Sequence, residues 1–307
     1  MIRPPESDFW QVGVVPLPIA RCVEPAAIAA VREQIHWLPD PGPWRYLADP
    51  FGVQRPDATH LFVEAFDYRT KHAVIEHHEI GRDFVWRGCE PVLARPFHLS
   101  YPYIVEDGGE VFMVPESHRA QEVALYRARN FPRDWVRETV LLPQTPGAET
   151  SLIRHAGRWW MFFTIVGPQA RDQRELHAAY AEKLTGPWRL HPQNPLLDDR
   201  GGARPGGTPF VGADGLVTLP VQDCRDTYGG ALRFVEFVVL ETDRIVTRHL
   251  PGRLSGGTAS PTHADGFHTL ASCGERTLID TKRISRSRTR HWIDCRRRAT
   301  RLWRKLT

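Results

Sequence analysis

The stretch Leu47-Ala48-Asp49-Pro50-Phe51 opens an apolar run that turns near Asp57 and returns as Leu61-Phe62-Val63-Glu64, with a polar residue at its end. Comparable units begin at four later places in the chain, namely Tyr101, Glu149, Arg204 and His268. Counted from Asp49, successive starts are 52, 48, 55 and 64 residues apart, the length of a four-stranded blade and not of a helical repeat. The sequence therefore predicts an all-β fold, a five-bladed β-propeller.

The second run of each unit ends on a polar residue in the first four blades: Glu64, Glu116, Thr164 and Gln222. An antiparallel hairpin returns its second strand to the edge where the first began, so starts and ends share one face. In a propeller that face surrounds the mouth of a central channel. The residues predicted to ring this mouth are Asp49, Glu64, Glu116, Glu149, Arg204, Gln222, Asp223 and His268.

Three segments follow from this pattern. Residues 40–285 are predicted to form the propeller, residues 1–39 a lead-in with a closing strand, and residues 286–307 a basic amphipathic tail. The chain has 307 residues, of which 41% are hydrophobic, enough for a full core in one domain. It lacks a run of about 18 apolar residues and the features of a signal peptide, which favours a cytoplasmic location.

The cysteines do not predict a cross-linked or metal-bound protein. They are odd in number, widely spaced and contain no C-x-x-C pair: Cys22, Cys89, Cys224, Cys273 and Cys295. This argues against a disulfide framework and a zinc site, and no metal or cofactor is predicted. The one alternative metal cluster is His72, His77 and His78 beside Glu76 and Glu79, in a charged, turn-rich stretch.

The tail concentrates positive charge. Residues 282–307 carry eleven Lys or Arg and one acid, Asp294. An apolar stripe recurs there at helical spacing: Trp292, Cys295, Ala299, Leu302, Trp303 and Leu306. A basic helix of this kind suits an anionic membrane surface, in this case the inner face of the membrane. The alternative is a terminal helix whose tryptophans pack on the propeller. No nucleic-acid partner is predicted, because the rest of the chain offers no basic face or recognition motif.

Several ordered motifs resemble a known propeller. They include His98-Leu99-Ser100-Tyr101-Pro102-Tyr103, Pro115-Glu116-Ser117, Leu184-Thr185-Gly186-Pro187-Trp188, Gln222-Asp223-Cys224 and Gly266-Phe267-His268-Thr269. Together they span nearly all of residues 40–285 and resemble the N-terminal propeller of plant glucosamine inositolphosphorylceramide transferases. The resemblance implies a glycan or glycolipid ligand. The glycosyltransferase domain that follows this propeller in the plant proteins has no counterpart here, so a separate glycosyltransferase is a possible partner and transferase activity is not carried over.

That propeller is in turn similar to the five-bladed arabinanase and xylosidase glycosidases. In those enzymes an Asp in the first blade is the general base, a second Asp tunes the acid, and a Glu protonates the leaving oxygen. Asp49 matches the first position, and Glu149 and Arg204 stand at the comparable blade starts. Arginine cannot donate a proton at physiological pH, so the resemblance does not transfer the mechanism unchanged.

The residues themselves still allow glycoside chemistry, which needs one protonated and one ionised carboxyl group. Glu116 is the predicted acid, because burial and neighbouring carboxylates should raise its pKa. Asp49 is the predicted base or nucleophile, and Glu64 and Glu149 orient and tune the pair. Predicted substrate-binding residues are His98, Tyr101, Arg204, Gln222, Asp223, Tyr228 and His268.

Two other functions remain open at this stage. One is a glycan-binding or glycolipid-binding module without turnover, and the other is a scaffold whose rim binds protein while each mouth residue merely closes its own blade. The sequence contains no G-x-S-x-G elbow, Walker loop or H-E-x-x-H. Ser117-His118 is discounted as a nucleophile pair because adjacent side chains on an extended strand point apart.

Overall fold

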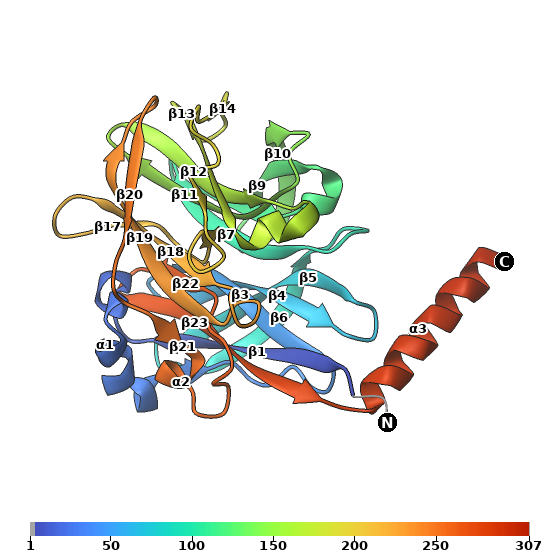
Figure 1. The fold of residues 1–307 in the computed structure, drawn as a ribbon. Coiled ribbons are helices and arrows are strands. Elements are labelled where there is room, and N and C mark those ends of the chain that lie inside the picture. Colours follow the sequence, from blue (N-terminus) through green and yellow to red (C-terminus); the bar gives the residue numbers. More distant parts are fainter. Residues whose placement is uncertain (1–3, 307) are drawn as a thin grey trace.

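The structure is a computed structural model that describes residues 4–306, with side chains described to residue 299. Five antiparallel sheets surround a common axis (Figure 1). Blade one consists of β3 (Arg45–Gln54), β4 (Ala58–Asp67), β5 (His72–Gly81) and β6 (Trp86–Leu93). Blade two consists of β7 (Ser100–Asp107), β8 (Glu110–Glu116), β9 (Glu122–Asn130) and β10 (Arg133–Pro143). The predicted five-bladed propeller is confirmed.

The later blades are less regular. Blade three contains β11 (Gly147–His155), β12 (Arg158–Ile165), β13 (Glu175–Ala181), β14 (Arg189–Leu190) and β15 (Leu197–Asp198). Blade four contains β16 (Arg204–Pro205), β17 (Phe210–Val211), β18 (Val217–Asp223), β19 (Ala231–Leu240), β20 (Ile245–His249) and β21 (Leu254–Ser255). Their innermost strands β11 and β16 contact each other, as β3 and β7 do in the first two blades.

Blade five joins the two ends of the propeller. It is built in the order β2 (His36–Trp37), β1 (Glu6–Val15), β23 (Arg276–Arg286), β22 (Leu270–Cys273). β1 pairs with β23 along its whole length, from Glu6 opposite Arg286 to Val15 opposite Thr277. The ring is therefore closed by hydrogen bonds between the first and last strands of the chain.

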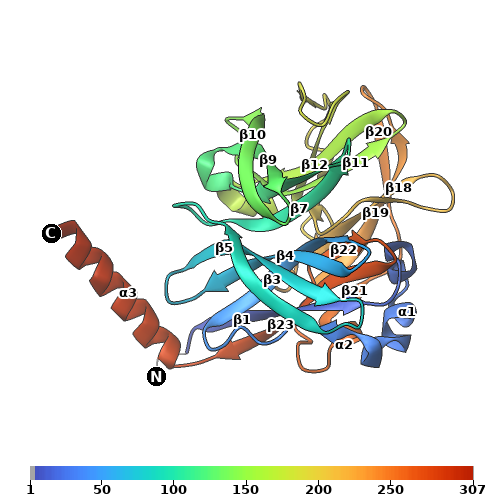
Figure 2. The same cartoon turned by 180° about the vertical axis from the view of Figure 1, so that it is seen from behind.

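The helices are short except for the last one. They are η1 (Ile19–Val23), α1 (Pro25–Ala30), η2 (Arg32–Gln34), η3 (His118–Ala120), η4 (Pro168–Gln173), α2 (Gly256–Ala259) and α3 (Thr289–Leu306). α3 projects away from the sheets (Figures 1 and 2). Within the described residues, none of these helices combines the length and hydropathy needed to cross a bilayer. All five cysteines lie in the described chain, and none is paired.

Aromatic side chains fill the space between blades. Phe62 of blade one meets Trp135 of blade two edge to face at 5.3 Å, and Phe162 of blade three stacks on Phe237 of blade four at 4.4 Å. All four side chains are buried. Large flat residues suit this role because each buries much apolar area against the neighbouring sheet. The blades are thus held at fixed angles around the axis.

A β-bulge turns one residue of each of the first three blades toward the axis. The register shifts between Ala48 and Phe51, between Ser100 and Tyr103, and between Ala148 and Ser151. In each case the last residue paired before the shift is followed by a residue with a left-handed backbone: Asp49 (φ 50°), Tyr101 (φ 44°) and Glu149 (φ 51°). Such bulges re-aim side chains next to functional sites.

Below the mouth, the channel is closed by backbone and side-chain contacts. The Tyr101 hydroxyl crosses the axis, bonds to the hydroxyl of Ser151 at 2.8 Å and accepts a hydrogen bond from the Gly207 N–H at 2.6 Å. Gly207 has φ 143°, and a Cβ there would lie 1.9 Å from the carbonyl oxygen of Leu270. Only glycine fits this close approach. The mouth is therefore the top of a blind pocket.

Candidate functional site

A pocket of about 150 Å³ opens at the predicted mouth. Its lining comes from four of the five blades and the linker before blade two: Trp10, Tyr46, Asp49, Glu64, His98, Ser100, Glu116, His118, Arg204, Tyr228 and His268. The wall is mostly polar, with aromatic faces, which is the mixture that sugar rings require. The mouth is therefore an open cavity and is not plugged by side chains.

Asp280 of β23 organises the floor. One of its oxygens accepts hydrogen bonds from the backbone N–H of Thr269 (3.0 Å) and from Nδ1 of His268 (2.8 Å), and the other accepts the backbone N–H of Asp49 at 2.9 Å. Asp280 is completely buried. It ties the end of blade five to the start of blade one and fixes the orientation of the His268 ring.

His268 lies between aromatic walls. Its ring stacks on Trp10 with centroids 3.7 Å apart and an angle of 13°, and it meets Tyr228 edge to face at 5.6 Å. Burial alone would lower the pKa of His268, but Asp280 and Asp49 raise the pKa above its ordinary value. Nε2 of His268 lies 3.5 Å from Oδ1 of Asp49. We therefore expect the ring to be a cation at the base of the pocket.

Arg204 covers Glu149. Its Nη2 donates to Oε1 of Glu149 at 2.5 Å and its Nη1 donates to the backbone oxygen of Asp172 at 2.6 Å, while the guanidinium lies over the Tyr228 ring. Arg204 lines the pocket but Glu149 does not. Burial raises the pKa of Glu149 to about 8; Arg204 opposes this rise, and Asp49 and Glu116 add to it. Glu149 is thus a support for Arg204.

Glu64 is a buried carboxyl group of the pocket whose pKa is strongly raised. Burial is the main cause that raises its pKa well above the usual range, and the nearby charges of Asp49 and Glu116 add to the effect. The Tyr46 hydroxyl donates to Oε1 of Glu64 at 3.4 Å, and Nε2 of His98 lies 3.4 Å from the same oxygen. Burial lowers the pKa of His98 to about 4, so this ring is neutral. Burial likewise raises the pKa of Asp49.

The pKa of Glu116 is lowered, whereas the sequence predicted that it would be raised. Burial by itself would raise its pKa, but Nδ1 of His118 at 2.7 Å and the charge of Arg204 hold the pKa below the ordinary value. Oε2 of Glu116 lies 4.0 Å from Nη2 of Arg204. The pKa of Glu116 is thus displaced downward, opposite to the pKa values of Glu64 and Asp49 in the same pocket.

Several of the predicted ring residues lie elsewhere. Tyr101 bonds beneath the pocket, Gln222 donates to the Pro205 backbone oxygen at 2.9 Å, and Asp223 pairs with Arg225 at 2.6 Å. The buried Thr164 donates to the backbone oxygen of Arg171. None of these four lines the pocket. Gln222, Asp223 and Thr164 bond within their own blades, as the structural alternative supposed, whereas Tyr101 joins blade two to blades three and four.

Other site residues were missed from sequence: Trp10, Tyr46, His118, Asp172 and Asp280. Asp280 carried a usable signal, because it follows the apolar Leu278-Ile279 as Glu64 follows Leu61-Phe62-Val63. His118 opens the short helix η3 just after β8, so the strand period did not mark it. Nothing in the local sequence marked Trp10 as a site residue, because it reaches the site only through the pairing of β1 with β23.

Two groups of side chains have donor types suited to a cation. Asp49, His268 and Asp280 offer ligand atoms within 4.8 Å of one another, and so do Glu76, His78 and Cys89. The alternative cluster expected from sequence does not form as a unit. His77 turns to His60, with ring nitrogens 2.9 Å apart, whereas His78 accepts from the indole of Trp86 at 3.3 Å.

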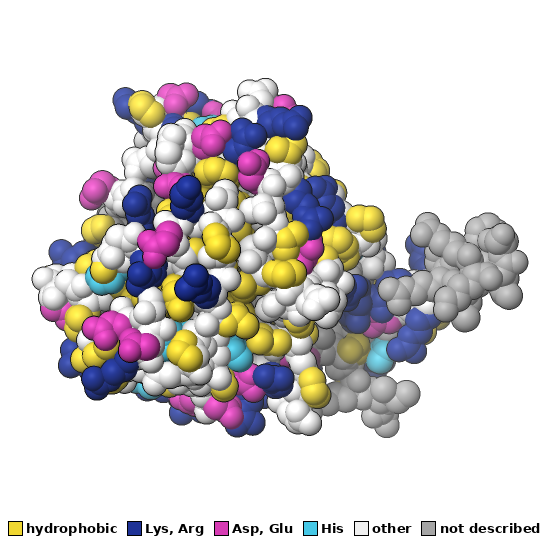
Figure 3. All heavy atoms as spheres, turned by 90° about the horizontal axis from the view of Figure 1, so that it is seen from above, with side chains coloured by type: hydrophobic (Ala, Val, Ile, Leu, Met, Phe, Trp, Pro, Cys, Tyr) yellow, Lys and Arg dark blue, Asp and Glu magenta, His cyan; other side chains and the backbone are white. Residues whose placement is uncertain are grey.

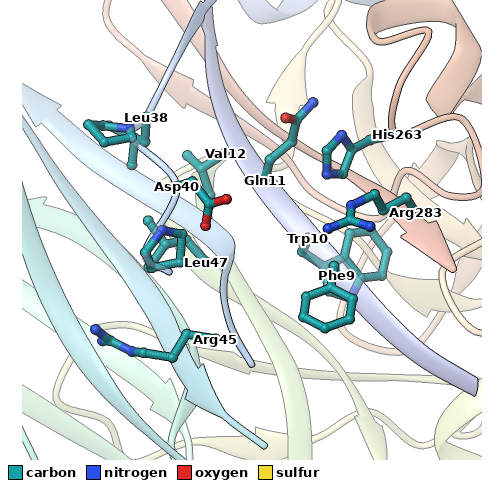
Figure 4. A pocket seen from close by; sticks show the side chains of 12 residues that line it. Phe9, Trp10, Gln11, Val12, Leu38, Asp40, Arg45, Leu47, His263 and Arg283 are labelled. Atoms are coloured by element: carbon teal, nitrogen blue, oxygen red, sulfur yellow. The ribbon is translucent and has the colours of Figure 1, made fainter. Parts of the chain in front are cut away.

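A second pocket of about 110 Å³ lies beside the first, between blades five and one. Figure 4 shows Phe9, Trp10 and Arg283 on one side of it and Arg45 and Leu47 on the other. Trp10 lines both pockets. Trp10 is therefore a wall that the two pockets share.

Comparison with known proteins identifies the family. The family model for the N-terminal region of glucosamine inositolphosphorylceramide transferase 1 matches residues 29–255. The chain belongs to this family. The match includes blades one to four and stops before the fifth blade's Gly266-Phe267-His268-Thr269.

Curated members of the glucosamine inositolphosphorylceramide transferase family are much longer. Transferase 1 of Oryza sativa subsp. indica is 35% identical over 193 residues, which are 61% of this chain and 25% of the relative. Transferase 1 of Arabidopsis thaliana is 31% identical over 210 residues, 66% of this chain and 26% of the relative. The chain thus matches about a quarter of the length of these relatives.

Solved glycosidases share the fold of this transferase-family propeller. A family 117 glycoside hydrolase of the marine bacterium Zobellia galactanivorans aligns with a TM-score of 0.54 and 12% identity, over 78% of this chain and 84% of the other. An α-L-arabinofuranosidase of Podospora anserina aligns with a TM-score of 0.53 and 10% identity, over 75% and 78%. At these identities the likeness establishes the architecture alone.

Proposed function

We propose that this chain binds a terminal sugar of a glycan or glycolipid in the mouth pocket and hydrolyses or transfers it with a carboxyl pair. One observation carries the proposal: Glu64 and Glu116 line the same pocket, and their pKa values are displaced in opposite directions. Carboxyl groups with pKa values driven apart can serve as acid and base in one step. The family's relation to glycolipid enzymes agrees with such a substrate.

In the proposed reaction, Glu64 donates its proton to the glycosidic oxygen as the bond from that oxygen to the anomeric carbon breaks. Glu116 acts as a carboxylate on the other side, either removing a proton from an attacking water or forming a glycosyl ester that water or an acceptor hydroxyl later cleaves. Arg204 and His268 bind sugar oxygens as donors. Asp49, whose oxygens accept from the Tyr101 N–H and the Thr269 hydroxyl, is a positioning residue.

The second candidate is recognition without turnover, in support of a separate glycosyltransferase. It is favoured by the comparison with curated relatives, because three quarters of their length lies outside the region that matches this chain. In that case the same pocket holds the sugar, and Glu64 serves as a hydrogen-bond donor to it.

Kinetics on a panel of nitrophenyl glycosides separates the two. We expect turnover that Glu64→Gln and Glu116→Gln each reduce about 100-fold or more in kcat, the scale of general acid or base catalysis. Glu182→Gln, on an exposed carboxylate of blade three, is the matched control and should retain full activity. Thermal stabilisation by monosaccharides without turnover would establish recognition instead. If neither turnover nor stabilisation is found, both candidates are wrong.

A further inference from the structure

α3 is rooted on the face of the propeller that carries the pocket. It begins at Thr289, shortly after β23, the strand whose Asp280 supports the pocket floor. The guanidinium of Arg290 lies 4.2 Å from the centre of the Tyr68 ring. Tyr68 follows β4, the strand that brings Glu64 to the mouth. The two strands that connect α3 to the propeller, β23 and β4, therefore both also contribute residues to the pocket or its floor.

The helix turns its described tryptophan outward. Arg290 is buried, and Asp294 pairs with both Arg290 (3.3 Å) and Arg297 (2.8 Å) on the inner side. Trp292, by contrast, is 78% exposed, and Cys295, one turn further, is exposed too. The alternative in which the helix packs its tryptophans on the propeller is wrong for Trp292. The side chains of Leu302, Trp303 and Leu306 lie outside the described part of the chain.

Exposed basic residues follow this indole on α3, at Arg296 and Arg298. Burial lowers the pKa of Lys71, in the turn after β4; the guanidinium groups of Arg297, Arg290 and Arg298 lower it further, and Asp294 opposes them. The turn and the helix therefore form one basic cluster. On the face seen in Figure 3, by contrast, basic and acidic side chains are interspersed. A cluster of like charges beside an exposed tryptophan complements an anionic bilayer, where the indole lies at the headgroup level and the cations meet lipid phosphates and carboxylates.

We propose that α3 and the turn at Lys71 form a docking surface for an anionic membrane, and that the pocket takes its sugar from a lipid-linked glycan presented by that membrane. The second part rests on the proposed function; the first does not. The second pocket, whose Phe9 contacts Tyr68 at 5.5 Å, lies between the mouth and the base of the helix. A glycolipid can thus extend from the mouth toward the membrane along the side of Trp10.

Co-sedimentation of the full chain with vesicles tests the docking surface. The probes are phosphatidylcholine vesicles with and without 30 mol% (about one third) phosphatidylserine, a strongly anionic mixture. We expect binding only to the anionic vesicles, weakening as salt is raised. Since each basic residue near the lipid contributes about a fivefold factor in affinity, Arg296→Glu with Arg298→Glu should weaken binding by about 30-fold or more. Trp292→Ala should weaken it as well.

Two matched controls lie on the far face of the propeller. Arg154→Glu and Trp86→Ala change an exposed arginine and an exposed tryptophan at turns away from the mouth, and both should bind vesicles as the parent chain does. Equal binding to neutral vesicles, or unchanged binding by the α3 variants, would overturn the proposal. So would RNA binding or self-association through α3 in place of vesicle binding. Sugar-induced thermal stabilisation without vesicles reports on the pocket separately, so failure of the proposed function is distinguishable from failure of docking.

Discussion

Blades one to three and blade four deliver their axial residues in different ways. In the first three blades the innermost strand is bulged, and the left-handed residue that follows the last pair before the bulge faces the axis, as Asp49 does after Ala48. In blade four Arg204 itself pairs with Gln222, just as Ala48 pairs with Glu64, and Pro205 continues the register. Arg204 therefore occupies the register position of Ala48 and not of Asp49.

This difference changes how the repeat should be interpreted. If the blades are aligned at their predicted starts, Arg204 stands where Asp49 and Glu149 stand in their blades, as though an arginine had replaced an acid. The register instead shows a long side chain that enters from the neighbouring position and lies over Glu149. A bulge, which depends on one extra residue, decides which side chain reaches the axis. The charge balance of the mouth therefore follows from local backbone geometry as much as from residue type.

Removing Arg204 should have the largest effect. Arg204→Met removes the buried hydrogen bonds that Arg204 donates to Glu149, Asp172 and Tyr228. Each lost partner costs about 1–3 kcal/mol, so we expect the free energy of unfolding to fall by about 3–5 kcal/mol, measured by urea denaturation. Arg154→Met, on an exposed arginine, should change it little. If the two variants were equally stable, Arg204 would not be the residue that holds blades three and four together at the axis.

A substitution at the first bulge should have an intermediate effect. Asp49→Val places a β-branched residue at φ 50° and should cost about 1–3 kcal/mol through the backbone alone. Asp49→Asn tolerates the left-handed conformation and keeps an oxygen acceptor, so its urea midpoint should stay near that of the parent chain. Equal loss in both variants would show that the charge, and not the bulge, dominates at this position.

The pH dependence of Glu149 should give the smallest effect. Because its folded pKa is raised to about 8, the folded state holds a proton that the unfolded state has released between the ordinary carboxyl range and pH 8. Stability should therefore fall as pH rises through this window, and Glu149→Gln should flatten the fall. Urea midpoints at pH 5 and pH 8 (about the two ends of the window) measure this. A parent chain with the same pH slope as the variant would contradict the assignment.

The repeat made the architecture predictable, since turns and apolar runs are local signals. It also identified Asp49, Glu64, Glu116, Arg204 and His268 as neighbours of one mouth, and all of these line the pocket. His98 and Tyr228, predicted as substrate-binding residues, line it too. The role of each residue within the pocket was harder to predict from the sequence. The pKa of Glu116 depends on His118 and Arg204, and that of Glu64 on complete burial, so neither follows from strand position. Trp10 depends on a pairing between the two ends of the chain.

That pairing makes completion of the site a late event in biosynthesis. Trp10 lies on β1, which is translated before blade one, yet its partner strand β23 is made only after the other four blades. Contacts between such distant segments form slowly, because a long loop must close first. A nascent or damaged chain that has not closed its ring lacks the aromatic wall against His268. The pocket wall is therefore complete only after the first and last strands of the propeller have paired.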